Sequence, residues 1–124
     1  MKKRTFLVAI TAMALAGTAL AHGVKAKFGG VMGEANDLQF ELVNKNGSGT
    51  IYVYTDHGKD VTTDGASGTL TVTNGKVKTE VALTASGKNI LETKGDAKLV
   101  AGSKAIATIT FADKKTVLVN FISK

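Results

Sequence analysis

The chain has 124 residues, with no cysteine, no proline and no tryptophan, and it carries 16 basic and 10 acidic residues. After position 21 it keeps 13 lysines against the same 10 acidic residues, a net charge of +3, and these lysines are scattered along the chain, with Lys114 and Lys115 the one adjacent pair. The lack of cysteine excludes disulfides, thiolate metal ligands and thiol nucleophiles, and the scattered charge argues against nucleic-acid binding.

Residues 1–21 have the pattern of a secretory signal peptide. Basic residues at positions 2–4 form a positive segment, an apolar stretch covers positions 6–17, and positions 19–21 read Ala-Leu-Ala. The apolar stretch is shorter than the roughly 20 residues of a membrane-spanning helix. We therefore expect cleavage after Ala21, no lasting membrane anchor, and a soluble periplasmic protein whose single domain covers residues 22–124.

Alternation of apolar and polar residues predicts β-strands almost throughout the rest of the chain. The segment "DLQFELV" alternates clearly, and "TIYVYT" has the β-branched and aromatic composition of a strand. Turn sequences such as "NKNGSG", "DHGKD", "ASGKN" and "KGDAK" recur between such segments, and no segment has a convincing helical period. The sequence predicts an all-β fold, a single antiparallel β-sandwich or small barrel of about seven strands.

Two hairpins can be predicted with their registers. In "GTLTVTNGKVKTEVAL", a two-residue Asn-Gly turn places Val72 opposite Val77. In "KAIATITFADKKTVLVNFI", a three-residue Asp-Lys-Lys loop places Phe111 opposite Val117. Both registers put the apolar residues of the paired strands on one face.

No catalytic motif stands out in the sequence. It has no nucleophile-elbow pattern and no HExxH motif, and most serines and carboxylates fall at turn positions, where they bond the local backbone. The glycines of "GGVMG" at 29–33 lack the lysine of a phosphate-binding loop, and a bent strand is the better interpretation. We expect a protein that is not an enzyme.

Metal binding has more support, and the candidate ligands are His22, Asp56 and His57. Cleavage after Ala21 would give His22 a free α-amino group, which together with its imidazole Nδ1 closes a six-membered chelate ring. Cu²⁺ prefers such nitrogen donors and stands at the top of the divalent affinity order. The amino group loses its proton near neutral pH, with an ordinary pKa of about 7.7–8.0. His57, which follows Asp56 in "YTDHGKD", is the only other imidazole of the chain.

Simpler interpretations of these residues stay open. Cleavage after Ala19 would leave His22 inside the chain, and even as the first residue it can belong to a disordered terminus. His57 precedes a glycine in a turn, where such a residue is common. Met32 could add a soft thioether ligand for Cu⁺, although a single methionine in an apolar stretch is typical of packing.

The segments "HGVKAKFGGVM", "LQFELV" and "IYVYTDHGKDVTTDGASGTLTVTNGKVKTEVALT" resemble small periplasmic proteins associated with heavy-metal resistance. They also resemble an auxiliary β domain of adaptor proteins of RND-type heavy-metal efflux pumps. The resemblance covers nearly all of residues 22–124. It implies a small β-barrel or sandwich that binds or senses copper, zinc or nickel, with His22, Asp56 and His57 as ligands. The chain departs from this family in separating the histidine from the glycine pair and in lacking a His-rich tail.

Two functions follow as hypotheses. The first is a periplasmic buffer or carrier of a metal ion linked to efflux or resistance, with Cu²⁺ preferred over Zn²⁺ and Ni²⁺. The second is a metal-free interaction module that docks onto an efflux-system or envelope protein, through a sheet edge or through an exposed face bearing Tyr52 and Tyr54. The small number of potential ligands, two histidines and no cysteine, favours the second.

Overall fold

The computed structural model describes residues 23–124, so the expected signal peptide and His22 lie outside the described residues. The described residues form one antiparallel sheet of eight strands and contain no helix that could cross a membrane. This confirms the all-β prediction. The strands are β1 (Val31–Ala35), β2 (Leu38–Lys45), β3 (Ser48–Thr55), β4 (Ser67–Asn74), β5 (Val77–Ala85), β6 (Ile90–Thr93), β7 (Lys104–Thr110) and β8 (Thr116–Ile122).

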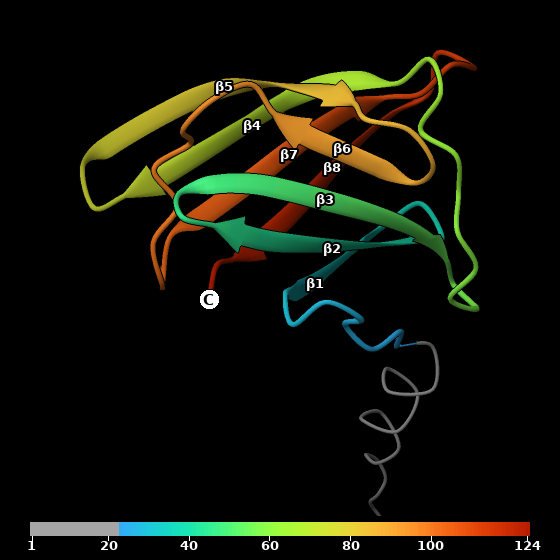
Figure 1. The fold of residues 1–124 in the computed structure, drawn as a ribbon, viewed down its shortest axis with the longest axis horizontal. Coiled ribbons are helices and arrows are strands. Elements are labelled where there is room, and N and C mark those ends of the chain that lie inside the picture. The colour runs from blue at the N-terminus through green and yellow to red at the C-terminus, as the bar shows by residue number, and fades with distance from the viewer. Residues whose placement is uncertain (1–22) are drawn as a thin grey trace, which may run out of the picture.

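The sheet curls into a nearly closed barrel (Figure 1). The strand order is β1-β2-β3-β6-β5-β4-β7-β8, which makes β1 and β8 the two edges. These edges meet at Gly33, where an added Cβ would lie 2.7 Å from Cγ1 of Val119 and 2.9 Å from the carbonyl oxygen of Asn120. Because glycine has no Cβ, β1 can come close enough to β8 to complete the wall.

Apolar side chains on alternate strand positions fill the inside of the barrel. Phe40 of β2 and Val53 of β3, for example, are 0% exposed. Apolar side chains of the other strands and of the connecting loops pack against these two residues inside the barrel. The buried cluster also contains Leu42, Ile51, Ala66, Leu70, Val72, Leu83, Leu91, Ala97, Leu99, Ala105, Ala107, Ile109, Val117, Val119 and Phe121.

Strands β2 and β3 are buried on both faces. Glu41 lies between two inward-pointing residues of β2, so its side chain points outward, yet it is 0% exposed. Tyr52 and Tyr54 share this outer face and are also buried. The segment that precedes β1 lies over them and forms a second layer at this side of the barrel.

The two predicted hairpins have the predicted faces but not the predicted registers. Val72 lies opposite Thr79 and not Val77. Val117 lies opposite Ile109 and not Phe111. Each register differs from the prediction by two residues, and a shift of two leaves every side chain on its face.

Long-range contacts explain the register of the first hairpin. Asn74 is the last residue of β4, and its Nδ2 donates a hydrogen bond to the carbonyl oxygen of Lys98 at 3.0 Å. Its Oδ1 accepts a hydrogen bond from the hydroxyl of Ser103. Asn74 therefore pairs with Val77 as part of the ladder, and Gly75 and Lys76 become the two central residues of the turn. Gly75, with φ of 60°, takes the first central position, where a type II′ turn requires glycine.

Closure of the barrel at Gly33 can be tested by replacing it with alanine. We expect Gly33→Ala to lower the free energy of unfolding by about 1–3 kcal/mol, because the new methyl group overpacks the contact with β8. Urea denaturation measures this change. Glu34→Ala is the matched control, since that exposed side chain points away from the barrel, and it should change stability by less than about 0.5 kcal/mol. Equal stability of the two variants would contradict closure at this point.

Candidate functional site

A buried carboxylate holds the amino-terminal segment against the sheet. We call residues 24–30 the strap. The backbone N–H of Lys27 donates to Oε1 of Glu41 at 2.9 Å. The N–H groups of Phe28 and Gly30 donate to Oε2 at 2.8 and 2.9 Å. Three main-chain donors of the strap thus converge on one side chain of β2.

Two glycines allow the strap to follow this path. Gly29 has φ of 76°, a left-handed conformation that other residues rarely adopt. A Cβ on Gly30 would collide with the carbonyl oxygen of Leu42 on β2. The pair therefore turns the chain and then brings it down onto the strand, so the sequence "FGGV" has a structural role here.

Aromatic and cationic contacts add to this attachment. The ring of Phe28 stacks on that of Tyr52 with centroids 4.2 Å apart. The ammonium of Lys27 lies 4.5 Å from the centroid of the Tyr54 ring, a cation–π contact. The same ammonium donates to the carbonyl oxygen of Gly58 at 2.8 Å. Lys27 therefore joins the strap to the loop that follows β3.

The prediction of an exposed face bearing Tyr52 and Tyr54 is wrong. Their side chains are 9% and 1% exposed, because the strap covers them. Phe28 is the aromatic residue that this region presents to solvent, at 56% exposed. An interaction surface made by the two tyrosines would require the strap to leave the sheet.

The hydrogen bonds around Glu41 change the ionisation of two groups. Burial alone would raise the pKa of Glu41, but the strap N–H groups and the Tyr54 hydroxyl, 3.3 Å from Oε1, hold that pKa below its ordinary value. For Tyr54, burial and the adjacent Glu41 charge raise the pKa well above its ordinary value. At neutral pH the carboxylate is therefore ionised and the phenol is neutral and donates to it.

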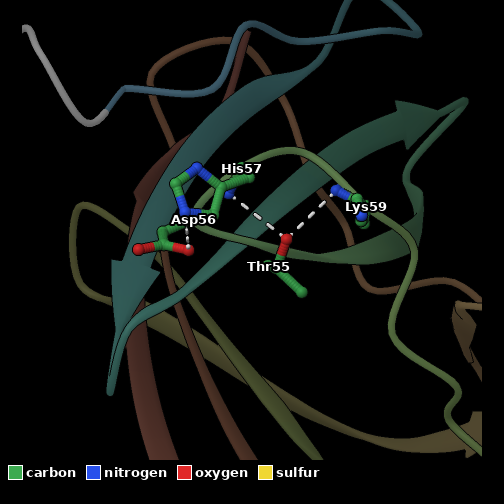
Figure 2. A network of polar contacts seen from close by, with 4 residues as sticks. All are labelled: Thr55, Asp56, His57 and Lys59. Carbon is green, nitrogen blue, oxygen red and sulfur yellow. Dashed lines mark hydrogen bonds and ion pairs between the residues drawn. The ribbon is translucent and has the colours of Figure 1, made fainter.

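The predicted ligands Asp56 and His57 lie in a tight turn after β3. The hydroxyl of Thr55 accepts hydrogen bonds from the N–H groups of His57 and Lys59 at 3.2 and 3.1 Å (Figure 2). Gly58 continues the turn with φ of 83°. The turn backbone is thereby fixed, while both candidate side chains extend from it toward solvent.

Asp56 and His57 are adjacent and accessible. Their side chains are 42% and 82% exposed, and Oδ1 of Asp56 lies 3.6 Å from Nε2 of His57 (Figure 2). Within residues 23–124, no group of three or more His, Cys, Asp or Glu side chains could hold a metal ion. The described residues therefore supply two of the predicted ligands, and the third, His22, lies outside them.

The start of the strap lies beside this turn. Cγ1 of Val24 is 3.8 Å from the point where a Cβ on Gly58 would stand. Met32, the one sulfur ligand considered, lies away from this turn, half-buried on β1 opposite Glu41. Its placement fits a packing role. Among the described residues, the structure thus places Val24 and Lys27, and not Met32, beside the turn that carries His57.

Comparison with known proteins gives no further indication of function. The chain matches no protein-family model, no curated protein and no solved structure. What the protein does must therefore be inferred from its own residues.

The sequence did not identify Glu41 as part of the site. It stands in "LQFELV", where alternation assigns it to an outward position and an exposed carboxylate is the usual outcome. One available signal was the pair of tyrosines on the neighbouring strand, which lie on the same face. Aromatic side chains beside an outward carboxylate indicate that another part of the chain covers it.

The strap attachment should depend on pH. A lowered pKa in the folded state means that Glu41 contributes stability above the ordinary value of about 4.5, and that this contribution is lost as the pH falls through the folded pKa. We expect Glu41→Gln to cost about 2 kcal/mol at pH 7, because the amide cannot accept all of these donors. The cost should be smaller at pH 3, below the ordinary pKa of 4.5, because the carboxyl group of the unfolded chain is then mostly protonated and the linked stabilisation declines.

Urea denaturation of both proteins at pH 7 and pH 3 measures this difference. Glu34→Gln is the control for a general carboxylate effect, because Glu34 is exposed on the neighbouring strand. A cost of Glu41→Gln that stays constant between the two pH values would contradict an ionised anchor.

Proposed function

We propose that the protein is exported to the periplasm and binds Cu²⁺ there, as a buffer or carrier linked to heavy-metal efflux or resistance. The ligands are the α-amino group and imidazole of His22, the imidazole of His57 and the carboxylate of Asp56. The ion is the cargo of the protein, and no catalytic step is involved.

The position of Val24 carries this proposal. Val24 follows His22 by two positions, and its Cγ1 lies 3.8 Å from the point where a Cβ on Gly58, the residue after His57, would stand. Two residues span at most about 7 Å of extended chain. A chain of this length would allow His22 to reach the turn, although it stands 35 positions before His57 in the sequence.

The donor set suits copper. His22 offers two nitrogens, His57 a third, and Asp56 an oxygen, and a tetragonal arrangement of nitrogen and oxygen donors is typical of Cu²⁺. Neighbouring ligands of a tetragonal ion, each about 2 Å from it, lie roughly 2.8 Å apart. Oδ1 of Asp56 and Nε2 of His57 are 3.6 Å apart, so these two exposed side chains need to approach by less than about 1 Å to share an ion.

A Cu²⁺ titration of the mature protein tests the proposal, with the amino terminus at His22 verified by mass. We expect one ion per chain, bound more tightly than micromolar. One extra glycine before His22 removes the amino–imidazole chelate, and His57→Ala removes the ligand of the turn. Each change should weaken binding at least roughly tenfold, equivalent to about 1.4 kcal/mol.

Asp64→Asn provides the control for surface charge, because this exposed carboxylate lies in a loop before β4. It should bind Cu²⁺ like the wild type. Equal and weak binding by all these proteins would refute a specific copper site.

A metal-free interaction module is the second candidate, and a patch on the outer face of β7 and β8 favours it. Leu118 and Ile122 are 58% and 57% exposed, and Ile106 is 38% exposed. Ile106 lies opposite Asn120, so the two β8 residues flank it diagonally. Exposed apolar patches of this kind are typical of binding surfaces.

Capture of an envelope protein under chelating conditions distinguishes this function from the first. We expect a partner of this patch to remain bound in chelator and to be lost with Leu118→Lys. That substitution should change stability by less than about 0.5 kcal/mol, since the side chain is exposed. Loss of the partner on adding chelator would argue for the metal-dependent function instead.

A further inference from the structure

We infer that the mouth of the barrel binds a short apolar peptide whose amino and carboxyl termini are free and charged. This site is separate from the proposed copper site, because among the described residues its lining includes none of the strap and neither Asp56 nor His57. The inference therefore does not rest on the copper function.

A cavity of about 530 Å³ lies at one end of the barrel, where three connections come together. They are the β1–β2 turn, the loop after β3 and the β7–β8 turn, all at the right in Figure 1. Sites for small molecules are typically about 300–1,000 Å³ in volume, and the mouth of a β-barrel is one of their usual places. The cavity is larger than a single amino acid, so we assign it to a peptide of two or three residues.

The floor of the cavity is apolar. Leu38 at the start of β2, Val61 in the loop after β3 and Phe111 just after β7 are half-buried and pack against the core. Val117 of β8 also lines the cavity. A ligand with apolar side chains would cover this floor and remove apolar surface from water, which favours binding.

The rim of the cavity carries charges of both signs. Asp37 stands in the β1–β2 turn, Asp113 and Lys115 stand in the β7–β8 turn, and all three are exposed. Oδ1 of Asp113 accepts the backbone N–H of Lys115 at 3.0 Å, which fixes this carboxylate in its turn while Oδ2 can accept from a ligand. Carboxylates suit the amino terminus of a peptide and a lysine suits its carboxyl terminus, so a zwitterion complements this rim better than a ligand with one charge.

The backbone of the β1–β2 turn gives independent support for a role of Asp37. Its two central residues, Asn36 and Asp37, have φ of 50° and 63°. A type I′ turn of this kind favours glycine at the second central position. The turn at the other end of β2 follows this preference with Asn46 and Gly47. At the cavity the chain instead keeps a carboxylate in a costly conformation, and such residues cluster at binding sites.

Titration with trileucine, followed through the amide NMR signals of the protein, tests the inference. Three further probes separate the features of the ligand. Triglycine keeps both charged termini and lacks apolar side chains, trileucine with an acetylated amino terminus and an amidated carboxyl terminus lacks the charges, and free leucine is a single residue. We expect trileucine to bind with a dissociation constant below about 1 mM and to shift the signals of residues 36–38, 61 and 111–117. Each of the other probes should bind at least roughly tenfold more weakly.

Two variants test the rim. Asp37→Asn removes a charge and keeps a residue that tolerates the left-handed conformation, and Lys115→Gln removes the opposite charge. Each should weaken trileucine binding roughly three- to fivefold, the size expected for one solvent-exposed charge contact. Lys114→Gln is the matched control in the same turn, because Lys114 does not line the cavity, and Asp64→Asn is the control for an exposed carboxylate. Both controls should bind trileucine like the wild type.

Several results would overturn the inference. Signal shifts that fall outside the mouth, or no saturable binding of trileucine below about 1 mM, would exclude this site. Equal affinity for capped and free trileucine would exclude a zwitterionic ligand, and equal affinity for free leucine would exclude a peptide. Equal losses in Lys114→Gln and Lys115→Gln would contradict a contact inside the cavity. A chelator should leave all these affinities unchanged, so the failure of the copper function would not affect them.

Discussion

The desolvated carboxylate of Glu41 is the interaction on which the amino-terminal half of the molecule depends. A buried charge is costly unless strong donors replace the water it loses. Here the donors are main-chain N–H groups of the strap, a segment that forms no strand of the sheet. Ordering the strap costs conformational entropy, but without the strap the charge would lack its donors. The docked strap and the buried charge of Glu41 therefore stabilise each other, and both faces of β2 and β3 become buried as a result.

This dependence extends from the anchor to the barrel. The strap leads through Gly29 and Gly30 directly into β1, so fixing the strap also fixes the start of the strand that closes the wall. In the middle of β1, the absence of a side chain at Gly33 lets the strand lie against β8. One continuous segment thus covers the outer face, joins the sheet and closes it. The glycines of this segment permit a left-handed turn and close backbone approach.

Local sequence rules predicted the fold class and the faces of the strands, because alternation with a period of two depends only on neighbouring residues. They failed on the hairpin registers, since Asn74 looks like a turn residue until Lys98 and Ser103 bind its side chain. For the site, composition and spacing indicated Asp56 and His57 and the turn that holds them. Glu41 was not predicted because its burial depends on a strap that lies more than ten positions away.

The proposed copper function has to account for the small number of candidate ligands in the described residues. Asp56 and His57 are neighbours in the sequence, so they lie together in one turn. Two ligands alone bind a metal ion weakly, and under this proposal further donors come from a distant part of the chain. A free terminus would supply them only at a low effective concentration, and this cost decreases when the segment is held nearby before the ion arrives.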